Sequence, residues 1–375
     1  MRGVLTEEQE QLGAAVRALL AEKSSEAAVR KSIETAEGYD RELWAMMADQ
    51  MGLLSLAIPE QFGGDGYGSE EIGVVMHEMG RALYCGPYLS SVVMFATALA
   101  AAGDDDASAR YLPAIASGST IGTVALTEDK ESWGPEGVTL TARADGSTYT
   151  LTGSKTHVID GHIAEMVLVV GRTDAGVSLF LVDAGDPGLT RTPLPTLDRT
   201  RRQATLVFDG ARGRLVGSDG DGWAAVARTL DVATIALANE QVGGIERVLD
   251  MTVQYAKERT QFGRPIGSFQ AVKHKCADML VALESAKSTA RLAAAADAGG
   301  DPGVSALADL SKAVCSEAYS KATSETIQLH GGIGFTWEHP AHLYFKRARS
   351  SEVLFGGPSH HRRLLGERVG LLPVR

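Results

Sequence analysis

The chain has few cysteines, no long apolar run and no excess of positive charge. Its three cysteines, Cys85, Cys276 and Cys315, are odd in number and far apart. They predict reduced thiols and neither a disulfide framework nor a metal site. No run of apolar residues is long enough to span a bilayer, and the opening residues MRGVLTEE lack the apolar core of a signal peptide. These absences predict a cytoplasmic protein without a membrane segment.

The charge balance argues against polyanionic partners. Lys and Arg number 36 against 47 Asp and Glu, which gives a net charge of −11, and no basic cluster stands out. DNA, RNA and anionic membranes are therefore not expected as main partners. An apolar content of 44% and a charged content of 22% are typical of a globular protein, and we expect an enzyme or part of one.

Three compositional regimes divide the 375 residues, a length that suggests two or three domains. Residues 1–120 read as a helical domain. Thr6 and Gln9 form a capping-box pattern that is followed by apolar residues at helical spacing. Residues 43–51 and 69–83 read as further helices, separated by a glycine-rich loop.

Residues 121–217 change to a period of two, which predicts a small antiparallel β domain. Strands are expected at 138–143, 148–152, 166–171, 177–182 and 204–208. Residues 218–375 return to long helices, expected at 223–260, 269–298 and 304–329, with a last helical segment after residue 340. Long helices joined by short loops predict a four-helix bundle.

Two motifs in the last region suggest a nucleotide site. Residues 259–270 read RTQFGRPIGSFQ and residues 328–338 read QLHGGIGFTWE. Arg259 offers a fork of donors suited to a pyrophosphate, and two phenylalanines offer flat faces to an adenine. The pair Gly331 and Gly332 lets backbone amides approach a phosphate or ribose. Taken singly, each is better explained as a solvated cation, a core aromatic or a helix stop; the order of the pieces along the chain favours the nucleotide site.

Together these motifs resemble the flavin-binding segments of the acyl-CoA dehydrogenase family, whose order of helical, β and helical domains also matches. The resemblance implies FAD, with the adenosine end of each cofactor held by a neighbouring subunit. The residues that would hold it are Arg259, Gln261, Phe262, Phe269, Gln270, Gln328, Gly331 and Gly332.

The β region matches the family less well. Thr127 stands where a family threonine contacts the flavin, and His157 takes the place of an aromatic residue beside the ring. We expect a surface or packing role for His157, with a titrating role at the flavin as the alternative. Ile159 replaces a threonine that would hydrogen-bond the flavin, and an isoleucine side chain has no donor.

The catalytic base is the sharpest departure. Family members remove the substrate α-proton with a glutamate, and the resemblance places that glutamate at Gly356 or, in a minority, at Ala233. Glu240 is a weak candidate for a relocated base, seven residues and about 10 Å past Ala233 on one helix face. A buried or interface ion pair is the favoured role for Glu240, and a salt bridge is favoured for Glu352.

Two functions therefore follow from the resemblance. The chain is an acyl-CoA dehydrogenase in its own right, a homotetramer with a relocated base, or it is a non-catalytic subunit of an α2β2 assembly that completes a homologue's FAD site. The second is slightly favoured. Fatty-acid or steroid acyl-CoA substrates and an electron-transferring flavoprotein as acceptor are implied. Nitroalkane oxidation is disfavoured because it needs a base at the same position, whereas acyl reduction stays open.

Overall fold

The computed structural model describes residues 4–129 and 132–373, which group into two compact units. The bundle unit comprises Met1–Lys31, Ser69–Tyr84 and Thr234–Arg375. The β unit comprises Ser32–Gly68 and Cys85–Ala233. This grouping interleaves the chain, because segments from the helical N-terminal region contribute to each unit. The boundaries expected near residues 120 and 217 stay a prediction.

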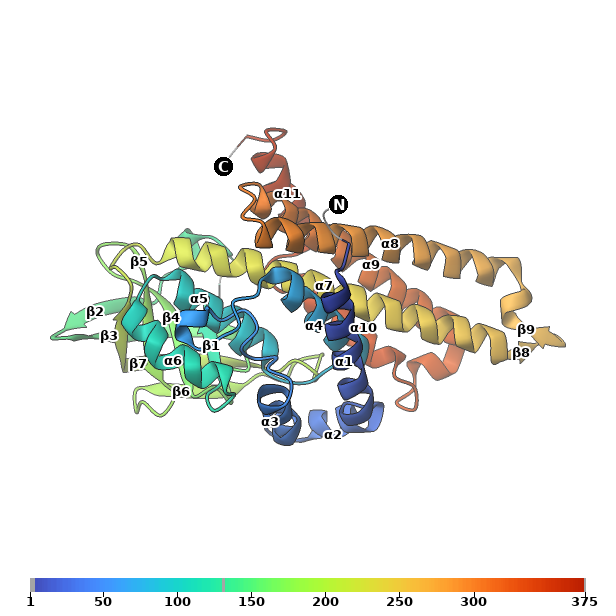
Figure 1. The fold of residues 1–375 in the computed structure, drawn as a ribbon, viewed down its shortest axis with the longest axis horizontal. Coiled ribbons are helices and arrows are strands. Elements are labelled where there is room, and N and C mark those ends of the chain that lie inside the picture. The colour runs from blue at the N-terminus through green and yellow to red at the C-terminus, as the bar shows by residue number, and fades with distance from the viewer. Residues whose placement is uncertain (1–3, 130–131, 374–375) are drawn as a thin grey trace. The chain divides into compact units, whose positions relative to one another are not determined.

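The β unit contains a seven-stranded sheet in the order β1-β4-β2-β3-β7-β5, with β6 beside β7 (Figure 1). A further pairing of β5 with β4 closes the ring of strands. The strands are β1 (Gly122–Ala125), β2 (Thr141–Asp145), β3 (Thr148–Ile159), β4 (Met166–Arg172), β5 (Val177–Asp183), β6 (Leu189–Pro193) and β7 (Gln203–Val216). Leu151, Val169, Phe180 and Leu206 lie in the closed apolar core that this ring surrounds.

The sheet is mixed, although most of its pairs are antiparallel as expected. β1 runs parallel to β4, and β2 meets β4 in a parallel pair at Thr141 and Arg172. The strand expected at 138–143 begins only at Thr141. The carboxylate of Glu128 accepts hydrogen bonds from the backbone amides of Thr139 (2.9 Å) and Leu140 (3.0 Å). A side chain thus takes the place of a strand partner, which periodicity could not predict.

Short helices complete the β unit. They are α3 (Arg41–Asp49), η1 (Glu60–Phe62), the π-helix η2 (Tyr88–Phe95), α5 (Ala96–Ala101) and α6 (Asp105–Ala116), and α2 (Glu26–Glu34) crosses the boundary between the units. Asp40 caps α3 through the amide of Glu42 at 2.9 Å. The buried hydroxyl of Tyr88 donates to Leu53 O at 2.9 Å, so this large side chain is fully satisfied.

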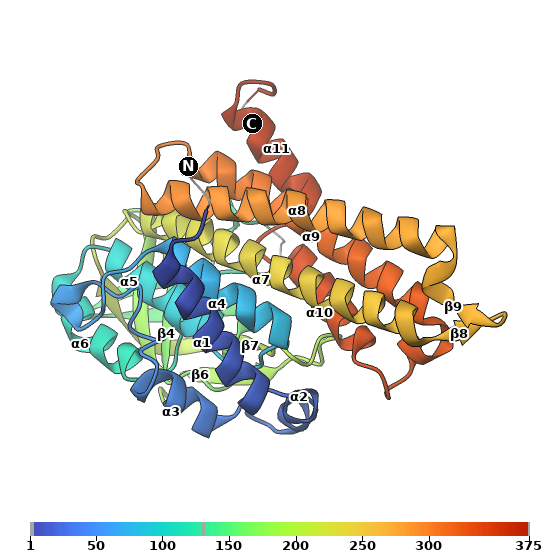
Figure 2. The same ribbon diagram turned by 45° about the vertical axis from the view of Figure 1, so that its right-hand side comes forward.

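The bundle unit is built on three long helices that lie side by side in both views (Figures 1 and 2), the first of which begins in the β unit and enters the bundle unit at Thr234. They are α7 (Trp223–Glu258), α8 (Gln270–Ala298) and α9 (Val304–His330), and their predicted ranges are confirmed. Around them lie α1 (Glu7–Lys23), α4 (Ser69–Ala82), α10 (Ala341–Val353) and α11 (Pro358–Arg368). The short elements are β8 (Thr260–Gln261), β9 (Arg264–Pro265), η4 (Ile266–Ser268) and η5 (Gly331–Phe335).

Glycines allow α4 and α7 to cross in close contact. A Cβ at Gly80 would lie 1.9 Å from the carbonyl oxygen of Glu240, and one at Gly243 would lie 1.8 Å from that of His77. No larger residue fits either position without moving a helix. The crossing therefore fixes α4 against the part of α7 that carries Glu240. The predicted capping box at the start of α1 is confirmed, since Thr6 and Gln9 exchange side-chain hydrogen bonds.

None of the three cysteines forms a disulfide in the described parts of the chain; Cys85 and Cys315 are buried and Cys276 is half-buried. None of the helices in the described ranges is both long and apolar enough to cross a membrane.

Candidate functional site

The first motif forms a β-hairpin at the end of α7. The amide of Arg259 donates to Tyr255 O and that of Ile266 donates to Arg259 O, each at 2.8 Å. β8 and β9 pair through Gln261 and Arg264, so the loop between them has two residues. Phe262 and Gly263 there have φ of 53° and 76°, as a tight type I′ turn requires. A bulky residue at positive φ is uncommon, and such outliers cluster at binding sites.

Several side chains of this hairpin are exposed to solvent. The ring of Phe262 is 90% exposed and meets Phe269 edge-on, with centroids 6.1 Å apart. Arg264 lies 4.2 Å over the Phe269 ring, so one face of that ring is already occupied. Within the described ranges, the exposed guanidinium of Arg259 has no hydrogen bond or ion pair. Gln270 is exposed, and the side-chain amide of Gln261 donates to Thr260 O at 2.8 Å.

The second motif forms the turn that ends α9. Gly331 adopts φ 62° and ψ −143°, a conformation that favours glycine. A Cβ added at Gly331 or at Gly332 would meet nothing within 4 Å. Gln328 is exposed, and so are Phe335 (81%) and Trp337 (58%). The packing of the chain itself therefore does not require Gly332 to lack a side chain.

The structure connects the two motifs at one end of the bundle unit, where β8, β9 and the end of α9 lie together in both views (Figures 1 and 2). The hydroxyl of Tyr255 donates to His330 O at 3.3 Å, and the two rings stack with centroids 4.4 Å apart. Sequence reasoning identified the motifs but missed this link. The helical register, which places Tyr255 one turn before Arg259, was the available signal.

The segment around Thr127 is tightly held within the β unit. The hydroxyl of Thr127 donates to Thr156 O at 2.5 Å, so its remaining capacity is to accept hydrogen bonds. The fully buried ammonium of Lys155 donates to Leu126 O (2.9 Å) and to Glu128 (2.7 Å). Burial lowers the pKa of Lys155 to about 8, even though Glu128 stabilises the charged form. The two segments expected beside a flavin are thus locked together.

His157 and Ile159, two residues apart on β3, differ in exposure. His157 is exposed and has φ of 54°, at a bulge in the pairing of β3 with β7. Ile159 is buried at 4% exposure, so its side chain packs in the unit and leaves no polar group at that position.

A side chain at the position expected for the catalytic base would strain the backbone and press against His360. Gly356 has φ of 105°, and a Cβ there would lie 2.6 Å from Cδ2 of His360. The preceding Phe355 is also at positive φ (62°), and its carbonyl accepts a hydrogen bond from Nε2 of His361 at 3.1 Å. Both the backbone conformation at Gly356 and the nearby His360 ring therefore disfavour a glutamate at this position.

Glu240, the weak candidate for a relocated base, lies in a buried ion pair with Arg347. The two side chains are 4% and 3% exposed, and Arg347 also donates to Tyr84 O at 3.0 Å. A carboxylate held in this way is not positioned as a free proton acceptor, which agrees with the favoured role. Glu352 forms the expected salt bridge, with Arg349 at 2.8 Å.

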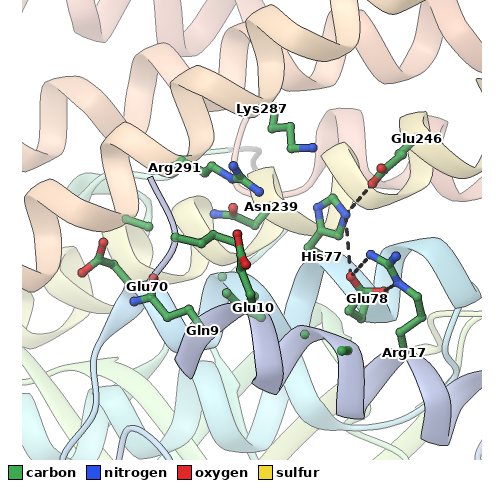
Figure 3. A pocket seen from close by; sticks show the side chains of 16 residues that line it. Gln9, Glu10, Arg17, Glu70, His77, Glu78, Asn239, Glu246, Lys287 and Arg291 are labelled. Atoms are coloured by element: carbon green, nitrogen blue, oxygen red, sulfur yellow. Dashed lines mark hydrogen bonds and ion pairs between the residues drawn. The ribbon is translucent and has the colours of Figure 1, made fainter. Parts of the chain in front are cut away.

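A separate cavity of about 200 Å³ lies between α1, α4, α7 and α8 (Figure 3). Several of the charged side chains that line this cavity form ion pairs with one another. Arg17 pairs with Glu78 at 2.7 Å and His77 with Glu246 at 2.7 Å. Burial raises the pKa of Glu246, but the hydrogen bond and charge of His77 outweigh it and lower the pKa to about 2. No predicted cofactor-binding residue is among the side chains that line this cavity.

Comparison with known proteins identifies the class. Residues 6–119 match the acyl-CoA dehydrogenase N-terminal domain, residues 123–211 the middle domain and residues 220–370 the C-terminal domain. The chain belongs to the acyl-CoA dehydrogenase family and is an oxidoreductase of that family. Membership of this family implies a flavin cofactor.

Its relatives include bacterial acyl-CoA dehydrogenases. Acyl-CoA dehydrogenase IpdE2 of Mycolicibacterium smegmatis is 37% identical over 97% of this chain and 100% of its own length. The ChsE4-ChsE5 complex from Mycobacterium tuberculosis contains a chain that is 34% identical, with a TM-score of 0.91 and full coverage of both chains. A chain of the Tcur3481-Tcur3483 steroid ACAD is 33% identical, with a TM-score of 0.87 over 97% of this chain and 98% of its own.

Proposed function

We propose that this chain is one subunit of an FAD-dependent acyl-CoA dehydrogenase and that it holds the adenosine half of an FAD whose reactive ring lies in a partner subunit. The observation that carries the proposal is a set of exposed groups that the chain itself does not use. Arg259 has no ion pair in the described parts of the chain, Phe262 is 90% exposed, and the glycines 331 and 332 face open space.

These residues fit the chemistry of the group. A guanidinium fork suits a pyrophosphate, and an exposed ring at a fixed turn suits stacking against adenine. Backbone amides beside two glycines suit close approach to a phosphate or ribose. Gln261, Phe269, Gln270 and Gln328 lie on the same two segments and complete the clamp. In the β unit, Thr127 offers an acceptor to a flavin.

The partner subunit in this proposal is a catalytic homologue. FAD, when bound, accepts a hydride from the acyl-CoA substrate, and a glutamate must take the α-proton. This chain has no free carboxylate at Gly356 or Ala233, and Glu240 is already paired with Arg347. Similarity to one chain of a two-component complex and of a steroid ACAD supports an α2β2 assembly and a bulky acyl-CoA substrate. The proposal further places this assembly in the cytoplasm, with an electron-transferring flavoprotein as acceptor.

The visible spectrum of the protein tests whether this chain needs a partner subunit to bind FAD. Expressed alone, the chain should retain little flavin, and it should gain flavin absorbance when co-expressed with a homologue that carries the glutamate. Strong absorbance of the chain alone, bleached by acyl-CoA, would instead establish a self-sufficient homotetramer.

The clamp itself is tested with Arg259→Ala in the assembled protein. Loss of one charge-assisted contact, about 1.5–3 kcal/mol, should raise the FAD dissociation constant roughly 10- to 150-fold. Arg212→Ala, which removes an exposed arginine of β7, is the matched control and should leave it unchanged. Equal flavin affinity of Arg259→Ala and the wild type would count against the clamp.

A further inference from the structure

A stack of three rings lies directly beneath the nucleotide clamp. Tyr255 and His330 stack with centroids 4.4 Å apart and planes at 28°, and His330 meets His339 at 4.3 Å. Tyr255 is one helical turn before Arg259 on α7, and His330 is the last residue of α9, immediately before Gly331. The stack therefore joins the two chain segments that the clamp uses.

Hydrogen bonds extend from the stack to the backbone of both segments. On one side the carbonyl of Tyr255 accepts from the amide of Arg259 at 2.8 Å. On the other, the hydroxyl of Tyr255 donates to His330 O at 3.3 Å. That carbonyl belongs to the peptide that leads into Gly331, where the chain turns. A side chain of α7 thus contacts the peptide group that comes just before the Gly331 turn.

Hydrogen bonds and burial both act on the protonation of the two histidines. Nδ1 of His330 lies 2.7 Å from Thr326 O and donates to it, a bond that the neutral and the protonated ring can both make. Nδ1 of His339 accepts from the amide of Ala341 at 3.2 Å. Burial lowers the pKa of His330 and that of His339 below the ordinary value of 6.5, and in His339 the charge of His330 contributes as well.

The groups that surround the histidines of the stack affect their protonation. Glu26 and Arg30 face His339 with opposite effects on its pKa. The Tyr255 ring and the Thr326 carbonyl face His330. Next to the stack, the Trp337 ring lies 4.6 Å from the His342 ring and 4.4 Å from Nζ of Lys346. Lys346 opposes a positive charge on His342, and no carboxylate among the residues that the structure describes is hydrogen-bonded to His330 or His339.

We infer that Tyr255 and His330 are positioning residues of the nucleotide clamp, which hold the Arg259 hairpin and the Gly331 turn in one geometry for FAD. This inference rests on the proposed function, because it assigns support for the same site. Neither residue touches the nucleotide. Each acts through the backbone that it fixes, and the clamp is pre-organised only while the stack is neutral and intact. Pre-organisation of this kind raises affinity by reducing the ordering that binding requires.

The test measures FAD affinity in the assembled protein by flavin fluorescence. Tyr255→Leu should raise the dissociation constant about tenfold, equivalent to ~1.4 kcal/mol. Tyr255→Phe keeps the stack, loses only the 3.3 Å contact, and should change affinity by less than about threefold. Tyr319→Phe, in a tyrosine buried elsewhere on α9, is the matched control and should lower thermal stability without changing affinity.

A pH profile separates positioning from plain structural support. Affinity for FAD should fall as the pH drops below 6.5, because protonation of His330 places a charge inside the stack. In His330→Asn, whose amide can still donate to Thr326 O, this fall should be reduced. Superimposable profiles, or wild-type affinity in Tyr255→Leu, would overturn the inference. If Arg259→Ala also keeps wild-type affinity, then the proposed function fails with it, whereas loss of affinity in Arg259→Ala alone leaves the proposed function standing.

Discussion

The Glu240–Arg347 ion pair offers the sharpest test of how this chain differs from a self-sufficient enzyme. Both side chains are at most 4% exposed. Removing one partner of such a pair leaves a buried charge without compensation, which costs about 3–5 kcal/mol. Arg347→Met also removes the contact to Tyr84 O. We therefore expect Arg347→Met and Glu240→Gln to destabilise the protein strongly, and the double variant to cost less than the sum of the two.

The expected loss of stability can be converted into a measurable decrease in the melting temperature. Unfolding entropy of roughly 2.1 cal/mol/K per residue gives about 0.8 kcal/mol/K for a chain of this length, so each kcal/mol lowers Tm by about 1.3 °C. Calorimetry should show Arg347→Met melting about 4–6 °C below the wild type. The double variant should be about 1–3 kcal/mol more stable than the sum of the two single effects predicts, and this difference is the coupling energy of the pair.

Two outcomes would refute this reasoning. Single variants that each cost less than about 1 kcal/mol, with additive effects, would show that the pair is not coupled. Loss of acyl-CoA turnover in Glu240→Gln, at a temperature where the variant is fully folded, would show that Glu240 is a base after all.

Three further predictions concern other positions. Gly356→Ala should destabilise by about 1–3 kcal/mol and by more than Gly146→Ala, whose φ of 64° has open space around it; equal denaturation midpoints would contradict the contact with His360. Burial lowers the pKa of His342 to about 4. The neutral ring therefore contributes stability above pH 6.5 that is lost as the pH falls towards 4, and circular dichroism should find His342→Phe unfolding at lower pH than the wild type. An unchanged acid midpoint would contradict this. Thr6→Ala should cost about 1 kcal/mol in urea, and Thr6→Ser almost nothing; a neutral Thr6→Ala would show that the cap is dispensable.

Local patterns predicted much of the fold correctly. The long helices were visible because their apolar residues recur at helical spacing without a breaker, and the capping box at Thr6 because its partners are three residues apart. The parallel pairing of β1 with β4 was not predictable, because strand order depends on contacts between distant segments. The late start of β2 likewise depends on a side chain, Glu128, that lies more than ten residues away.

The amino-acid sequence by itself determined the family, the order of its helical and β segments, the two motifs that we propose bind a nucleotide, and the lack of a glutamate at Gly356. These features depend on residue identity and on spacing along the chain, so they can be recognised without knowledge of tertiary contacts. Only the tertiary structure decided that Glu240 is neutralised by Arg347, that a side chain at Gly356 would press against His360, and that Tyr255 ties the two motifs together. Each of these is a contact between side chains or backbones that folding brings within a few ångströms, and no local pattern encodes it.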